Sequence, residues 1–299
     1  MRHTLFVAAF ALSLTALPGL ISAAPLPPQV EQVREKLRHG PLDDAIDAAD
    51  EATEQLSSDA VAWMWAGRVY GRQAMEANLL TKAKWAGRSR DAFEKAVELQ
   101  PNLIEARFDL MQYYLLAPGF MGGGRDKAEL QAAAIAALDA AEGKVAAGHL
   151  AAQDKDEVKA ESLYRQALAS NGESVRALFA LNAFLQNRKR FDEVRALWTD
   201  ALQRDKVRAL AQYQLGRLAA ISGEQLEQGL QYLDAFIADG EEPEQLTVAA
   251  AQWRRGQLLD KLGRPQEAMT AFERALSDRD VGELAKNDLE RLRKSSAKG

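Results

Sequence analysis

The sequence predicts an all-α fold, a solenoid of stacked antiparallel helix pairs that ends in a C-terminal capping helix. Hydrophobic residues make up 47% of the 299 residues and charged residues 27%, a composition typical of a folded chain. Alanine, leucine, glutamate, glutamine, arginine and lysine dominate, and β-branched residues do not alternate with polar ones over the length of a strand. The sequence also aligns with itself at a fixed shift, which is typical of repeat architectures.

The internal repeat has a period of 34 residues, as the spacing of matching aromatic, alanine and small positions shows. Three columns fall in register: Tyr164, Trp198 and Tyr232; Ala167, Ala201 and Ala235; Gly148, Asn182 and Gly216. The segment 92–97 also returns almost unchanged as 271–276. A bulky residue and an alanine three positions later share one helical face, and the small residue allows a neighbouring helix to approach closely. Each repeat therefore predicts one helix pair.

These positions resemble the tetratricopeptide repeat, a family whose units stack into a right-handed superhelix. The positions that match its pattern recur along the chain: Trp63, Ala66, Gly67, Tyr70, Phe93, Ala96, Pro101, Leu110, Tyr114, Ala128, Gly148, Ala160, Tyr164, Ala167, Leu181, Trp198, Ala201, Leu215, Gly216, Tyr232, Ala235, Gly256, Leu259, Ala268, Phe272 and Ala275. The resemblance implies one solenoid over 25–299, with about six to seven helix pairs, the first degenerate, and a capping helix at about 282–293. An irregular helical bundle is the alternative.

The first 24 residues are expected to form a secretory signal peptide. Arg2 and His3 precede an apolar run, Pro18 breaks it, and the small residues 22–24 follow at a suitable cleavage site. An uncleaved membrane anchor is the alternative, although the run is shorter than the roughly 20 residues that span a bilayer. The sequence contains no cysteine. We therefore expect a periplasmic protein without stable membrane insertion after cleavage.

Composition argues against several functional classes. The formal net charge is -5 and basic residues are interspersed with acidic ones, so we expect no nucleic-acid binding. The histidines His3, His39 and His149 have no metal-ligand spacing with other ligand types, and no serine lies in a nucleophile motif. We expect no catalytic residues, no metal and no cofactor, and hence no enzyme.

The segment 117–127 is glycine-rich and lies where two helices of one pair should meet. It fails as a phosphate-binding loop, because Arg125 and Asp126 stand where lysine and a hydroxyl residue are required. A structural turn is the favoured interpretation. Phe120 and Met121 near its tip either pack on the stack or contact a partner, and with Arg125 they form the loop candidates.

The resemblance also implies that the first helix of each pair lines a concave groove. One column along these helices is apolar: Met64, Phe108, Val145, Phe179, Tyr213 and Trp253. The column four positions later is mostly polar: Arg68, Gln112, His149, Ala183, Arg217 and Gln257. Arg72 follows one turn further on. Such columns suit a bound peptide, but the aromatic residues could equally complete the packing between pairs.

From these features we expect a protein-binding or peptide-binding scaffold in the bacterial cell envelope. The alternative is a periplasmic protein that binds a small molecule or a cell-wall fragment in a pocket between the inserted loop and the groove. Self-association of the stack is a third possibility. An open groove would favour a peptide, and a closed pocket beneath Phe120 and Met121 would favour a small ligand.

Overall fold

The structure is a computed structural model that describes residues 25–240, 242–243 and 246–296. The expected signal peptide lies outside the described residues. Within them every regular element is helical, which confirms the predicted all-α class. The helices are α1 Pro28–His39, α2 Leu42–Gln55, α3 Ala60–Glu76, α4 Leu79–Leu99, α5 Ile104–Leu116, η1 Gly119–Met121, α6 Arg125–Leu138, α7 Ala140–Gln153, α8 Glu157–Ser170, α9 Val175–Asn187, α10 Phe191–Ala201, η2 Asp205–Val207, α11 Arg208–Ser222, α12 Leu226–Asp239, α13 Val248–Lys261, α14 Pro265–Glu273 and α15 Gly282–Ser296.

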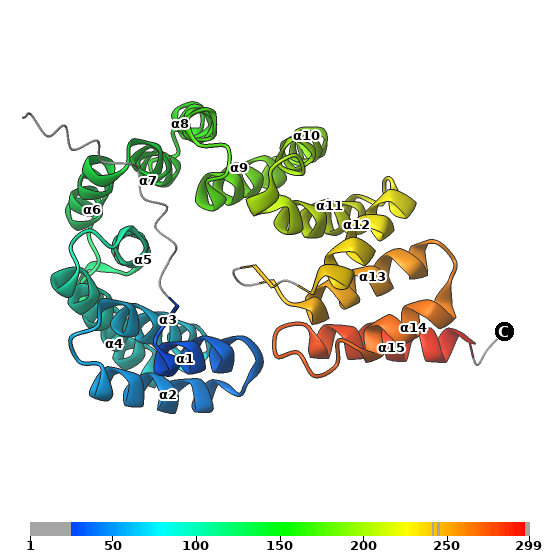
Figure 1. Cartoon of the computed structure of the whole chain (residues 1–299), viewed down its shortest axis with the longest axis horizontal. Helices are drawn as coiled ribbons and strands as arrows, with labels where there is room; N and C mark the ends of the chain where they lie inside the picture. The colour runs from blue at the N-terminus through cyan, green and yellow to red at the C-terminus, as the bar shows by residue number, and fades with distance from the viewer. Residues whose placement is uncertain (1–24, 241, 244–245, 297–299) are drawn as a thin grey trace, which may run out of the picture.

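The helices α1 to α14 form seven consecutive antiparallel pairs, and α15 packs against α14 at the end of the stack. The pairs follow one another around a curved path, with α5, α9 and α11 on its inner side (Figure 1). The first helices of successive pairs are also in contact: α3 packs against α5, and α5 packs against α7. The fold is therefore the predicted α-solenoid, and its first helices form the concave face. None of the described helices has the combined length and apolarity to cross a bilayer.

Close packing within four of the pairs, α3–α4, α7–α8, α11–α12 and α13–α14, depends on a glycine in the first helix facing a large residue in the second. A Cβ atom added to Gly148 would lie 2.4 Å from the Tyr164 ring, and one added to Gly256 would lie 2.5 Å from the Phe272 ring. In the pair α9–α10 this position is Asn182, whose Oδ1 accepts a hydrogen bond of 2.9 Å from the indole nitrogen of fully buried Trp198. Asparagine therefore stands where other pairs have glycine and accepts a hydrogen bond from the tryptophan, because a buried indole N–H requires an acceptor.

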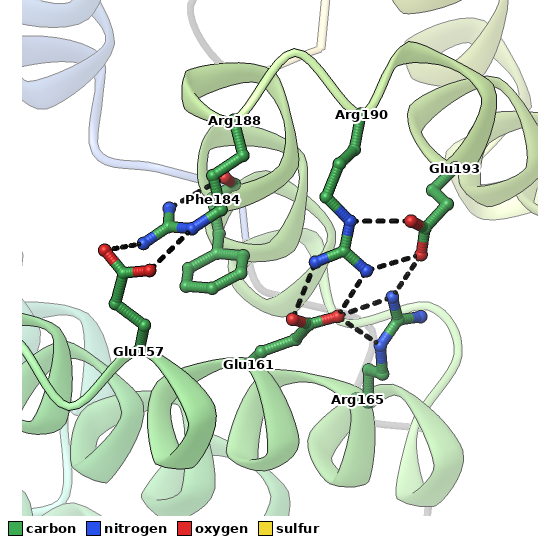
Figure 2. Close-up of polar contacts among 7 residues, drawn as sticks. All are labelled: Glu157, Glu161, Arg165, Phe184, Arg188, Arg190 and Glu193. Carbon is green, nitrogen blue, oxygen red and sulfur yellow. Dashed lines mark hydrogen bonds and ion pairs between the residues drawn. The ribbon is translucent and has the colours of Figure 1, made fainter.

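Ion pairs on the outer helices fasten neighbouring pairs to each other. Arg190, in the turn before α10, contacts Glu161 of α8 at 2.7 Å and Glu193 of α10 at 2.6 Å, and Arg165 of α8 contacts both carboxylates (Figure 2). Hydrogen bonding to Arg190, with a further contribution from Arg165, lowers the pKa of Glu161 to about 2. Geometry of this kind, in which a planar guanidinium meets two carboxylates, fixes the register between α8 and α10.

The two ends of the solenoid meet. Arg279, in the turn before α15, donates hydrogen bonds to the backbone oxygens of Leu37 and Gly40 at the C-terminal end of α1. Asp280 in the same turn pairs with Arg72 of α3 at 2.5 Å. Figure 1 shows α1 beside this turn. Because the last carbonyl groups of a helix lack intrahelical partners, an arginine is well suited to this contact. The curved stack consequently closes into a ring.

Candidate functional site

The apolar column of the predicted groove is mostly buried. Met64, Phe108, Tyr213 and Trp253 are all buried, and only Phe179 is half-buried. The Tyr213 ring packs edge-on against Phe236 of α12, with ring centroids 5.5 Å apart. Of the two interpretations that the sequence allowed, burial favours packing within and between pairs for these four side chains.

The polar column remains accessible on the concave face. Gln112 of α5 and Ala183 of α9 are exposed, and Arg68, Arg217 and Gln257 are partly exposed. These side chains come from successive first helices, so a row of accessible positions follows the inner side of the ring. The structure thus brings the polar candidates to one surface.

Arginines of the concave face on α3 and α9 are neutralised by carboxylates. Arg68 lies 2.7 Å from Asp109 of α5, and burial raises the pKa of that carboxyl although Arg68 opposes the effect. Arg176 of α9 lies 3.1 Å from Glu142 of α7 and stacks on the Phe108 ring at 4.6 Å. These ion pairs join helices of successive pairs, which makes them structural contacts.

His149 belongs to this neutralised part of the face, where it lies against the second helix of its own pair. Its Nδ1 is 3.3 Å from the Tyr164 hydroxyl, and the two rings meet edge to face. Burial, together with the positive charge of Arg176, lowers the pKa of His149 to about 4. The imidazole is therefore neutral near pH 7 and serves as a packing element with one polar contact.

Arginines in the C-terminal part of the concave face meet neutral partners. Arg217 of α11 donates to the Oε1 atom of Gln186 of α9 at 3.1 Å. Arg254 of α13 donates to Gln257 at 2.9 Å and lies over the Trp253 ring at 4.0 Å. Arg254 was not among the residues predicted from the sequence. No carboxylate lies three or four residues away from Arg217 or Arg254 in their helices, but the same is true of ion-paired Arg68, so this spacing does not identify them.

Hydrogen bonds to its backbone atoms stabilise the loop between α5 and α6, and the Phe120 side chain is exposed to solvent. The Met121 oxygen accepts a hydrogen bond of 2.8 Å from the Tyr113 hydroxyl, and the N–H of Gly124 donates to the oxygen of Tyr114. A Cβ atom at Gly123 would lie 1.8 Å from a backbone oxygen, so that position requires glycine. The Phe120 side chain is 87% exposed.

Arg125, the remaining loop candidate, is the first residue of α6 and forms structural contacts. It pairs with Asp154, at the end of α7, at 2.5 Å and with Glu129 at 2.8 Å. These contacts fasten α6 to the next pair. The loop candidates therefore separate into a structural arginine, a partly exposed Met121 and an exposed Phe120.

Comparisons with known proteins identify the type of repeat. Residues 249–277, which include most of α13 and all of α14, match the tetratricopeptide-repeat family model. The crystal structure of yeast Tom70 is similar with a TM-score of 0.57 at 15% identity, covering 94% of this chain and 60% of that chain. This likeness shows the fold, a tetratricopeptide-type solenoid.

Two further structures are more distant. A tetratricopeptide repeat protein from Parabacteroides merdae has a TM-score of 0.46 at 16% identity, covering 88% of this chain and 97% of that chain. The Cut9–Hcn1 hetero-tetramer of APC/C contains a chain with a TM-score of 0.48 at 14% identity, covering 91% of this chain and 50% of that chain. No curated protein sequence matches this chain.

Proposed function

We propose that this chain is a non-catalytic scaffold of the bacterial cell envelope that binds a protein or peptide segment on its concave face. One observation carries the proposal: the first helices α3, α5, α9, α11 and α13 each keep a side chain of the polar column accessible, while the apolar column beside it is largely buried. Such a row offers an extended segment repeated polar contacts above a rigid support.

A general property of the fold also supports a binding role. Extended concave surfaces are the usual binding faces of helical solenoids. The envelope location rests on the signal-like features of residues 1–24.

We do not extend the proposal to a small ligand. That alternative required Phe120 and Met121 to cover a closed pocket, whereas the Phe120 ring is largely exposed. Two of the depressions on the described surface lie beside Tyr232 and beside Tyr70, and neither is lined by a loop candidate or by Arg217.

Photo-crosslinking in living cells tests which face binds. A photoreactive amino acid would replace Ala183, which is exposed on the concave helix α9, or Gln166, which is exposed on the outer helix α8. The proposal predicts that the variant at position 183 captures a defined protein, identified by mass spectrometry, and that the variant at 166 does not. Equal capture at both positions, or capture only at 166, would contradict it.

A further inference from the structure

The strongest unexplained feature of the concave face is a pair of arginines without acidic partners on adjacent first helices. Neither Arg217 nor Arg254 forms an ion pair with any carboxylate in the described part of the chain, in contrast to Arg68, Arg72 and Arg176 on the same face. The carboxylate of Asp288, on α15, favours the charged form of Arg254 but forms no ion pair with it. It accepts instead from the Trp253 indole and pairs with another arginine.

The two positive charges act on each other and on Tyr213. Burial raises the pKa of Tyr213, and the charges of Arg254 and Arg217 oppose that rise. Burial also lowers the pKa of Arg254, and the charge of Arg217 adds to that effect. Arg217, Tyr213 and Arg254 therefore belong to one polar cluster on the contacting helices α11 and α13.

Burial makes this cluster costly in the free protein. The Arg254 guanidinium lies on the Trp253 ring, its Nε atom is buried without a hydrogen-bond partner, and desolvation lowers its pKa. An arginine stays protonated under such conditions, so its charge remains uncompensated. Two like charges that share a partly buried site destabilise the fold unless an anion joins them. Costly, unpaired charged groups of this kind are typical of binding sites.

We propose that Arg217 and Arg254 form a subsite for the carboxylate side chains of an acidic peptide segment. A planar guanidinium binds a carboxylate through two parallel hydrogen bonds, and it is the side chain best suited to that contact. The partners that these arginines now hold, the amides of Gln186 and Gln257, are neutral and yield to a charged acceptor. The exposed methyl group of Ala183, on the preceding first helix, leaves room for the peptide to approach.

The rest of the concave face gives the segment a direction. On the earlier first helices α3 and α9, Arg68 and Arg176 are already neutralised by Asp109 and Glu142. A segment with acidic residues at one end would therefore place that end over α11 and α13. The overall charge of -5 opposes general attraction of polyanions, so recognition of an acidic segment depends on this local cluster.

The inference rests on the proposed function and names the chemistry of its partner. It is tested with a fluorescein-labelled oligoglutamate of about ten residues, which is long enough to reach across several helix pairs. Oligoglutamine of the same length is the neutral comparison. Fluorescence anisotropy is measured at low ionic strength for the wild type, Arg217→Gln, Arg254→Gln and Arg274→Gln.

Arg274 provides the matched control, because it is exposed at the end of the outer helix α14 and forms no ion pair in the described chain. All three variants lose the same charge. We expect Arg217→Gln and Arg254→Gln each to weaken oligoglutamate binding by about tenfold or more, since a charge-assisted hydrogen bond is lost. Arg274→Gln should bind as the wild type does. Oligoglutamine should not bind measurably.

Two results would overturn the subsite: no binding of oligoglutamate by the wild type, or equal weakening in all three variants. Thermal unfolding serves as the fold control, and Arg254→Gln should be no less stable than the wild type because it removes an unpaired, partly buried charge. If photo-crosslinking at position 183 still captures a partner while oligoglutamate fails, the subsite is wrong and the scaffold function stands. If the crosslinking also fails, both proposals are wrong.

Discussion

Replacing His149 with glutamine should remove a large part of the protein's loss of stability in mild acid. The imidazole lies against Tyr164 between α7 and α8, 3.3 Å from its hydroxyl. Burial and the charge of Arg176 lower its pKa from the ordinary value of 6.5 to about 4. The folded protein therefore binds a proton at this site less readily than the unfolded chain does.

The sign and size of the effect follow from this difference. The free energy of unfolding is unaffected by His149 above pH 6.5, and it falls as the pH drops from 6.5 toward 4, because protonation then favours the unfolded chain. With these two pKa values, the loss between about pH 7 and about pH 5 amounts to about 2 kcal/mol. Glutamine keeps a polar side chain of similar length but does not titrate.

Urea unfolding followed by circular dichroism measures this directly. The wild type and His149→Gln would be unfolded at about pH 7, 6 and 5, and the difference in free energy between the two proteins compared at each pH. Carboxylates titrate alike in both proteins and cancel in that difference. We expect it to shift in favour of the variant by about 2 kcal/mol over the series. If the difference in the free energy of unfolding between the two proteins did not change with pH, His149 would not be buried as described.

Three further substitutions test the polar contacts that join helices of different pairs. Glu161→Gln should lower the free energy of unfolding by only about 1 kcal/mol near neutral pH, because solvent partly screens the ion pair. This loss should disappear as the pH falls from 4.5, the ordinary pKa of glutamate, toward about 2, where wild-type Glu161 also becomes protonated. Arg68→Gln should cost about 1–3 kcal/mol in urea unfolding, because it leaves the Asp109 carboxylate, only 25% exposed, without its partner; adding Asp109→Asn should recover much of that loss. Arg279→Ala should break the contact with the end of α1 and increase the radius of gyration in small-angle X-ray scattering. Arg274→Ala is the control. An unchanged radius in Arg279→Ala, or an equal increase in both variants, would show that Arg279 does not keep the ring closed.

The fold could be predicted from the sequence because the contacts that define a helix pair are local and repeat. Gly148 and Tyr164 lie 16 residues apart, as do Asn182 and Trp198. Gly256 and Phe272 have the same spacing. Periodicity reveals such contacts without any knowledge of the overall curvature. The likeness in fold to Tom70 agrees with that prediction.

The state of the candidate site could not be predicted in the same way, because it depends on contacts between pairs. The sequence placed Tyr213 on a first helix but did not determine whether its ring faces the groove or packs against Phe236. Likewise, Arg68 and Arg217 occupy equivalent positions in the polar column. Only the three-dimensional register shows that Arg68 meets Asp109 whereas Arg217 meets a neutral amide. The closure by Arg279 depends on curvature accumulated over the whole stack.

Single-cysteine labelling tests whether the concave face binds the partner. The chain contains no cysteine, so one introduced at Ala183 or at Gln166 is the only thiol. The rate of maleimide labelling would be measured for each variant alone and with the partner captured by crosslinking. We predict that the partner slows labelling at position 183 and leaves position 166 unchanged. Protection at 166 alone, or equal rates with and without partner at 183, would contradict the account.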